Sequence, residues 1–327
     1  MPVLNIPNDA TIRTLRNFLS VNTPFLDPQK AAVVRLHPNW AYMDPMALAI
    51  TAAWGGWCGR NGRQVRVVGT PGPHTNYAAR MRLFHHLKIQ YTIPLKEHEE
   101  AGRFMPLRRV SNPSDLNAVI GDVSALLHLD REPDGLAAIR YCVSELVRNV
   151  LEHSQSPEGA YVCAQRYFDT EPKRVTIAVA DCGVGIQRHL GKVYPEALTD
   201  GLTALRLAMK PGVTGAPRGM YGAPDNAGAG LFITRAIAKA TGGYFVLLSG
   251  SGAFRLRRCA SALKPQIFID PYDETQSDRW KLSTEWQGTV AATEIMTEKI
   301  SNFPGLFEWI RKQLPAQRTV SKRIKFT

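Results

Sequence analysis

The segment from residue 133 to residue 154 constrains the fold more than any other part of the sequence. Its apolar residues recur every three or four positions, at Leu136, Ile139, Val143, Leu146, Val147 and Val150. This spacing places them on one face of a long helix, which has to pack against another layer of structure. Glu145, Asn149 and His153 stand four residues apart and form a polar stripe beside the apolar one. Such a stripe most often faces solvent, so its meaning depends on the rest of the chain.

The elements around this helix have the order of an α+β domain. We expect helices at 114–129, 133–154 and 231–243, and strands at 159–168, 173–181, 243–250, 252–259 and 288–296. This order favours helices layered on one face of a mixed, largely antiparallel sheet. Between the second strand and the third helix lies a Gly/Pro-rich stretch, 187–227, with one short helical piece at 202–209. A loop of this length inside a compact domain is typical of a lid or a binding loop.

Residues 1–112 show a different pattern, in which short apolar runs alternate with helical stretches. We expect strands at 31–36, 64–69 and 89–95, a helix at 76–87, and a helix that begins at Pro45 with Asp44 as its N-cap. The alternation favours a smaller α/β unit with an open parallel or mixed sheet. The polar, proline-bearing stretch 105–115 is the expected boundary. The chain is thus divided into domains at 1–112 and 113–300 and a C-terminal helix and basic tail at 301–327.

Composition limits the classes of partner and compartment. The net charge of +12 favours anionic partners such as nucleotides. Nucleic acid is a possible but not a favoured partner, because no run alternates basic and aromatic residues. The five cysteines are scattered and show no paired metal spacing, which fits reduced thiols in the cytoplasm. No apolar run approaches the length of a membrane span, and no signal peptide is evident, so we expect a cytoplasmic protein without membrane partners.

Three glycine-bearing segments carry the candidate chemistry. Asp181 ends a strand and is followed by Gly183 and Gly185, so a carboxylate stands in a tight turn that a ligand can approach closely. Gly228 and Gly230 stand immediately before the helix at 231–243, where free backbone N–H groups and the helix dipole favour phosphate. The third segment is Gly288 with Thr289, which enters the last strand. Each motif is weak in isolation.

Taken in this order, the four segments resemble the nucleotide-binding boxes of the GHKL ATPase superfamily, which includes gyrase B, a heat-shock chaperone family, MutL and histidine kinases. SELVRNVLEH resembles the N box, DCGVGI and NAGAGLFI the two glycine boxes, and the GT at 288–289 the last-strand motif. The resemblance covers about 115–300 and implies a Bergerat-type sandwich that binds ATP and Mg²⁺.

The same resemblance implies a role for each residue. Glu145 would be the general base, and Asn149 the Mg²⁺ ligand. Asp181 would accept a hydrogen bond from the adenine amino group, and Thr289 would stand near the adenine. Two pairs of glycines would leave space, the first for the nucleotide and the second for closure of the lid on the phosphates. They are Gly183 with Gly185, and Gly228 with Gly230. In the lid, Lys210 and Arg218 are further candidates to reach the γ-phosphate.

The N-terminal unit more loosely resembles a STAS domain over about 30–95. Phosphoregulated members of that family have a serine at the start of the helix, whereas this chain has MDPMA there, with Pro45 and Met46. We therefore expect a packing or protein-interaction domain rather than a phosphorylation target.

Three functions are compatible with these features. The first is a hydrolase that uses ATP to close the lid and change its contacts with a protein partner or in a homodimer. The second is a serine protein kinase or partner switch of the anti-sigma type, whose nucleotide site would look nearly the same. The third is a nucleotide sensor without activity. A histidine kinase of the usual kind is not expected, because no helical hairpin with an acceptor histidine precedes the domain.

Overall fold

The computed structural model describes residues 3–25, 31–38, 42–69, 73–91, 103–126, 128–129, 131–168, 172–215, 228–258 and 265–314. Its centre is a five-stranded sheet with the strand order β6-β7-β8-β10-β9, in which all neighbours pair antiparallel. The strands are β6 (Phe104–Val110), β7 (Ala160–Tyr167), β8 (Arg174–Ala180), β9 (Phe245–Leu256) and β10 (Ser277–Ile295). The expected α+β fold with a largely antiparallel sheet is confirmed.

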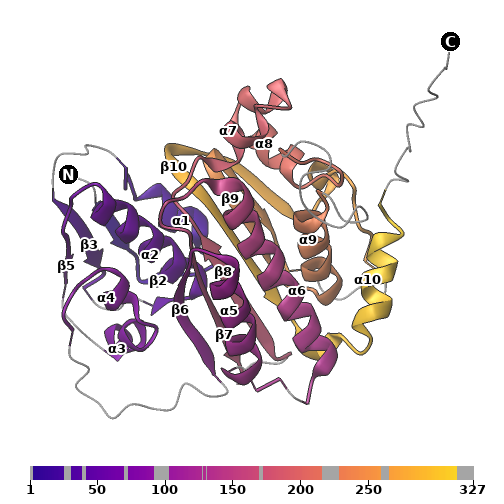
Figure 1. The fold of residues 1–327 in the computed structure, drawn as a ribbon, viewed down its shortest axis with the longest axis horizontal. Helices are drawn as coiled ribbons and strands as arrows, with labels where there is room; N and C mark the ends of the chain where they lie inside the picture. Colours follow the sequence, from indigo (N-terminus) through magenta and orange to yellow (C-terminus); the bar gives the residue numbers. More distant parts are fainter. Residues whose placement is uncertain are drawn as a thin grey trace.

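Helices cover one face of this sheet (Figure 1). They are α5 (Pro113–Leu126), α6 (Pro133–Asn149) and α9 (Gly230–Thr241), and α10 (Phe303–Arg311) packs against α6 and α9. The predicted stripe of α6 is buried in the core between these helices and the sheet, with Ile139, Val143 and Val147 inaccessible to solvent. A short π-helical turn, η1 (Val150–Ser154), continues α6. The helix that the sequence predicts at 133–154 therefore exists but changes its winding in its last turn.

Two strand predictions need correction. The expected strands at 243–250 and 252–259 form one strand, β9, because Gly250, at φ +57°, lets the strand continue past the turn-like sequence SGSG. The last strand begins at Ser277 rather than at residue 288, and its pairing with β9 is irregular between Lys281 and Thr289. These irregularities masked the continuous strand in the sequence pattern.

The N-terminal unit contains a three-stranded parallel sheet, in the order β1-β3-β5, and a short pair, β2-β4. The strands are β1 (Val3–Ile6), β2 (Asp9–Ala10), β3 (Ala32–Leu36), β4 (Tyr42–Met43) and β5 (Val65–Val68). The helices are α1 (Leu15–Ser20), α2 (Pro45–Arg60), α3 (Pro73–Arg80) and α4 (Leu83–His86). Asp44 caps α2 as predicted, since its Oδ1 accepts from the backbone N–H of Ala47 at 3.1 Å. The expected helix 76–87 is broken at Arg82, whose φ is +60°.

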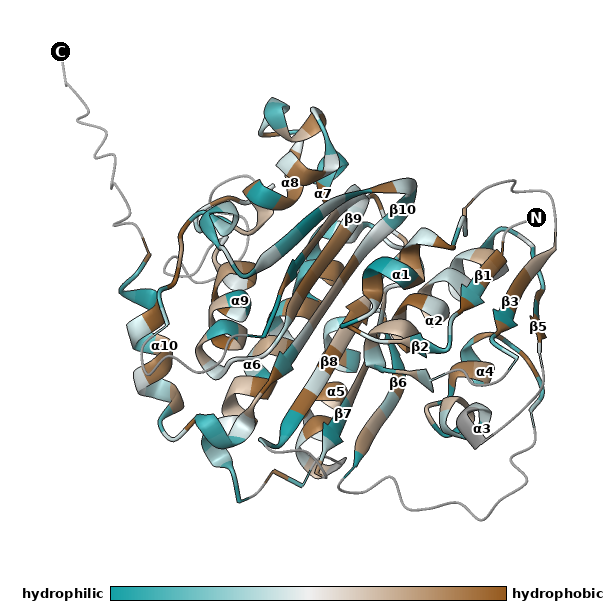
Figure 2. Ribbon diagram, turned by 180° about the vertical axis from the view of Figure 1, so that it is seen from behind, coloured by the Kyte–Doolittle hydropathy of each residue, from teal (hydrophilic) through white to brown (hydrophobic). Residues whose placement is uncertain are grey.

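The N-terminal unit packs on the face of the five-stranded sheet that α5, α6 and α9 leave open, as the reverse view shows (Figure 2). One hydrophobic core joins Ala53 and Trp54 of α2 to Cys163, Ala178 and Val290 of the sheet. The burial of α2 on nearly all sides follows from this position between two sheets. The division at residue 112 and the STAS resemblance stay predictions.

Two stretches of the first 112 residues differ from the expected pattern. The polar, proline-bearing stretch expected as the boundary contains a strand that the sequence pattern did not predict, since residues 104–110 form the edge strand β6. Its Pro106 lies where the pairing with β7 shifts register, a position that tolerates a missing N–H. The expected strand at 89–95 does not form over residues 89–91, and the rest of it lies outside the described residues. Within the described ranges, no helix is long and apolar enough to cross a membrane.

Candidate nucleotide site

The polar stripe of α6 extends over two residues, not three. Glu145 and Asn149 stand one α-helical turn apart, and both are half-buried. His153 lies in the π-helical turn η1, whose wider winding breaks the four-residue alignment. Its ring instead packs at a tilt against that of His189, with 4.7 Å between ring centroids. The expected stripe thus ends at Asn149, and His153 points to the lid.

The first glycine box holds a buried carboxylate with one unused oxygen. Asp181 is 1% exposed, and its Oδ1 accepts from the backbone N–H of Gly183 at 2.7 Å. Its Oδ2 is buried and has no hydrogen-bond partner among the described residues. Burial raises the pKa of Asp181 to about 7, although two backbone N–H groups oppose this shift. An unused acceptor in this position fits a ligand that brings a donor, such as an exocyclic amine.

This turn packs directly against the end of the α6–η1 helix. The backbone N–H of Val184 donates to the carbonyl of Ser154 at 2.7 Å. A side chain at Gly183 would overlap the same carbonyl, so only glycine allows this close approach. Gly185 has φ +76°, in the left-handed region that glycine favours. The two glycines therefore serve different needs, and both hold the N box and the first glycine box together.

Thr289 reaches the site through Ser249, a residue that the sequence analysis did not select. The Ser249 hydroxyl accepts from the N–H of Ile186 at 2.9 Å and donates to the carbonyl of Gly288 at 2.7 Å. Its Oγ lies 3.5 Å from the hydroxyl oxygen of Thr289. Gln287, also not predicted, donates to the carbonyl of Gly183. A polar residue inside the apolar run of β9 was the available signal for Ser249.

The second glycine box meets the N box at Glu145. Gly230 is the first residue of α9, and a Cβ added there would overlap Oε2 of Glu145. Among the described residues no side chain caps this helix N-terminus, so within that part of the chain its first N–H groups stay available to a ligand. Gly228, at φ +74°, accepts from the N–H of Gly212 at 3.1 Å and so ties the box to the lid. The structure thereby brings Glu145 to the N-terminal end of α9.

The residues present fit Mg²⁺ and a nucleotide. The amide nitrogen of Asn149 is buried without a partner, and its amide oxygen likewise has none in the described part of the chain. An amide oxygen is a ligand that Mg²⁺ accepts. Burial raises the pKa of Glu145, while Arg148, with Nη1 3.7 Å from Oε1, partly opposes the shift. A carboxylate with a raised pKa is suited to take a proton near neutral pH.

The lid begins with α7 (Gly185–Leu190), η2 (Pro195–Leu198) and α8 (Gly201–Ala208). Residues 216–227, with Arg218, lie outside the described residues. Lys210, the other expected phosphate contact, is engaged elsewhere, since its Nζ lies 2.8 Å from Oδ2 of Asp270. Lys210 is thus paired with Asp270 in this structure, and its contact with a γ-phosphate stays a prediction.

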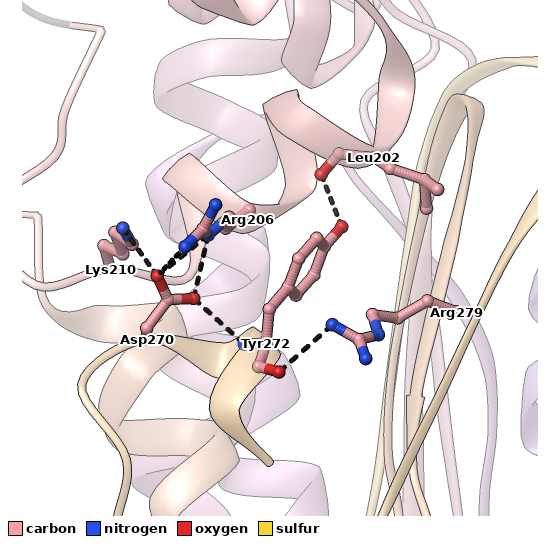
Figure 3. Close-up of polar contacts among 6 residues, drawn as sticks. All are labelled: Leu202, Arg206, Lys210, Asp270, Tyr272 and Arg279. Atoms are coloured by element: carbon pink, nitrogen blue, oxygen red, sulfur yellow. Dashed lines mark hydrogen bonds and ion pairs between the residues drawn. The ribbon is translucent and has the colours of Figure 1, made fainter. Parts of the chain in front are cut away.

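Asp270 anchors α8 to the segment before β10 (Figure 3). Arg206 of α8 donates to both of its oxygens, from Nε at 2.9 and 2.8 Å. The hydroxyl of Tyr272 donates to the carbonyl of Leu202 at 2.5 Å, and Arg279 donates to the carbonyl of Tyr272 at 3.1 Å. These contacts tie both ends of α8 to one short segment.

We expect Asp270→Asn to loosen α8 without unfolding the sheet. The variant loses the charge that pairs with Arg206 and Lys210, and these two side chains are partly exposed, so the loss is modest. Amide hydrogen exchange over 201–208 should become about tenfold faster, as for a local opening that is easier by about 1.4 kcal/mol. Asp273→Asn is the matched control, and equal exchange in both variants would show that Asp270 does not hold the lid.

Comparison with known proteins agrees with this geometry. Residues 110–243 match the family model of the histidine kinase-like ATPase domain. The match covers every predicted site residue except Thr289, and it supports an ATP-binding domain of the GHKL type. A search of curated proteins finds no match to this chain.

Proposed function

We propose that the chain binds ATP with Mg²⁺ at this site and hydrolyses it, and that the cycle moves the lid and changes contacts with a protein partner or a second copy. The observation that carries the proposal is the contact of Glu145 with Gly230. It puts a partly buried carboxylate beside the free N–H groups of α9, where a γ-phosphate would bind. A site that only bound nucleotide would not need a base in this position.

Each residue has a distinct task in this proposal. Asp181 accepts a hydrogen bond from the adenine amino group through Oδ2, the oxygen that is buried without a partner among the described residues. Asn149 holds Mg²⁺, which would neutralise the charge of the phosphates. The first N–H groups of α9 bind the phosphates, and Gly228 and Gly230 let the lid approach.

The hydrolytic step needs a base on the water. Glu145 takes a proton from the attacking water, whose oxygen forms a bond to the γ-phosphorus as the bond to the ADP oxygen breaks. The proton then leaves with the phosphate, which restores the carboxylate. The raised pKa of Glu145, caused by burial, strengthens its affinity for this proton.

A serine kinase of the anti-sigma type is the second candidate, because its nucleotide site would look nearly the same as that of the histidine kinase-like ATPase domain that the chain matches. A protein hydroxyl would then replace water, and Glu145 would deprotonate it. The deciding experiment incubates the purified chain with γ-labelled ATP, with and without candidate partner proteins. Label released as free phosphate supports hydrolysis, whereas label on a partner serine supports the kinase. ATP that is bound but unchanged in both cases would leave only a sensor.

Asp181→Asn should weaken ATP binding about tenfold and reduce the preference for ATP over GTP, because an amide accepts the adenine amine less well than a carboxylate does. The pH dependence follows from the pKa of about 7. Binding uses the ionised carboxylate, so ATP affinity should fall as pH drops through 7 and level off above it.

Isothermal titration of ATP and GTP between pH 6 and pH 8.5 measures both effects. The same variant controls for protonation of the phosphate groups of the ligand, because the wild type and Asp181→Asn are titrated with the same nucleotides. A wild-type pH profile that the variant reproduces would remove Asp181 from adenine recognition.

A further inference from the structure

A polar cavity of about 230 Å³ lies far from the nucleotide site, between the N-terminal unit and the open face of the five-stranded sheet. The sheet contributes Tyr167, Arg174, Thr176 and Glu294, and the N-terminal unit contributes residues near β2 and β4, among them Asp9 and Asp44. Arg174 begins β8 and Asp181 follows its end, so the two sites stand roughly 20 Å apart along one strand.

The polarity of this part of the sheet is unusual for an internal contact. Alternate residues of a strand share a face, so Arg174 and Thr176 lie on the same face as Ala178 and Ala180. The two alanines pack in the core with α2, whereas the two polar residues line the cavity. The same contact could have been filled with small apolar side chains along its whole length.

Arg174 is held in place by its neighbours. Its Nε lies 3.0 Å from Oε2 of Glu294, and its guanidinium carbon lies 4.4 Å above the ring of Tyr167. Glu294 is 2% exposed, and its other oxygen accepts from Nε of Arg258 at 2.7 Å. The contact with Glu294 is an ion pair whose geometry is not that of a hydrogen bond, and Arg174 makes no hydrogen bond to the residues that the structure describes. A fixed cation with unused N–H donors therefore faces the cavity.

Further donors stand beside Arg174. Thr176 lies opposite Glu294 in the sheet and is 2% exposed, yet its hydroxyl has no hydrogen-bond partner in the described ranges. The hydroxyl of Tyr167 accepts from that of Tyr42 at 3.3 Å, which leaves its own proton for another acceptor. The inner part of the cavity therefore offers three donors, of which one is charged.

The acidic groups decide the charge of the ligand. Both oxygens of Asp44 accept from backbone N–H groups, of Ile12 at 2.6 Å and of Ala47 at 3.1 Å, so Asp44 is occupied. Asp9 is exposed at the cavity mouth, and its carboxylate has no ion-pair or hydrogen-bond partner among described residues. Glu294 is paired with Arg174 and Arg258, and the exposed Arg13 adds a second cation to the lining. The cavity therefore presents both signs of charge, which a ligand with an anionic and a cationic end would satisfy together.

We propose that this cavity binds a small zwitterion of the α-amino acid class, with its carboxylate at Arg174 and Thr176 and its ammonium group toward Asp9. A volume of about 230 Å³ is below the range of roughly 300–1,000 Å³ for drug-sized ligands, and it suits a metabolite of this size. Because β8 runs from this cavity to Asp181, the N-terminal unit would place a metabolite site on the strand that ends at the nucleotide site.

The test titrates the full chain with each of the twenty standard L-amino acids by calorimetry and thermal shift. For every amino acid that binds, the matched amine without the carboxylate and the matched acid without the ammonium are titrated too. At least one amino acid should bind, and both truncated analogues should bind at least tenfold more weakly, since each leaves a charged partner unsatisfied. Saturating ATP should not displace the amino acid.

Two conservative variants locate the site. Thr176→Val keeps the shape and removes the hydroxyl, and Asp9→Asn removes the exposed charge, so each should weaken binding about tenfold. Thr199→Val, an exposed threonine of the lid, is the matched control and should bind as the wild type does. The proposal is overturned if no amino acid binds, if an amine or a carboxylic acid binds equally well, or if Thr176→Val and Asp9→Asn leave the affinity unchanged.

Discussion

Asn149→Ala should reduce Mg²⁺-dependent ATP turnover by roughly a hundredfold or more, because a bound metal supplies several kcal/mol of stabilisation to phosphoryl transfer. The amide of Asn149 is half-buried and has no hydrogen bond within the described residues, so its removal breaks no internal contact. The fold should therefore survive, and the loss should be specific to the metal. Titrating ATP with and without Mg²⁺ measures whether the loss is specific to the metal, because the Mg²⁺ dependence of the ATP affinity should then disappear in the variant.

Two further variants make this result decisive. Asn149→Asp keeps an oxygen ligand at the same position and should retain most of the Mg²⁺ dependence. Asn61→Ala changes an exposed asparagine at the end of α2 and should behave as the wild type does. If Asn149→Ala kept its Mg²⁺ dependence, the metal ligand would have to be sought elsewhere in the site.

Periodicity predicted the helical layer of this fold well. The apolar stripe of α6 and the cap at Asp44 are local signals, and both are confirmed. Sheet edges were harder to predict, because Pro106 and two arginines in β6 resemble a linker when the partner strand β7 is not known. The packing of α2 against the five-stranded sheet also depends on contacts between residues more than a hundred positions apart, and no local pattern encodes them.

The candidate site residues that the sequence selected belong to short motifs, and the structure brings several of these motifs together. Glu145 and Gly230 come from different boxes, and the structure places them in contact. His153 lies outside the predicted stripe, because a four-residue spacing in the sequence does not distinguish a π-helical turn from an α-helical one. Its ring packs at a tilt against that of His189, and burial lowers the pKa of His189 to about 4 and that of His153 below its ordinary value, so neither ring carries a charge at neutral pH. The ion pair of Lys210 with Asp270 could not be predicted, since the two residues are distant in the sequence and only the folded chain brings them together.

Glu145→Gln should lower the rate of phosphate release by a factor of about 10² to 10⁴, which is the usual contribution of a general base. Glutamine has nearly the same shape, so it should still fit against Gly230, and ATP affinity should change little. Burial raises the pKa of Glu145, so the wild-type rate should begin to fall with acidification at a higher pH than an exposed glutamate would give. The base has to be ionised to accept a proton, and the rate therefore rises with pH through this pKa.

Single-turnover phosphate release separates this loss from a loss of binding, because saturating protein removes the effect of affinity. Glu152→Gln is the matched control, since it removes an exposed carboxylate seven residues further along the same helical segment. The charge of Glu152 helps to raise the pKa of Glu145, so the two variants are compared at a pH above that pKa, where Glu152→Gln should leave the rate unchanged. If Glu145→Gln released phosphate at the wild-type rate, Glu145 would not be the base, and its contact with Gly230 would only fix the position of α9. If the variant lost transfer to a partner serine together with phosphate release, the same carboxylate would serve both water and hydroxyl acceptors.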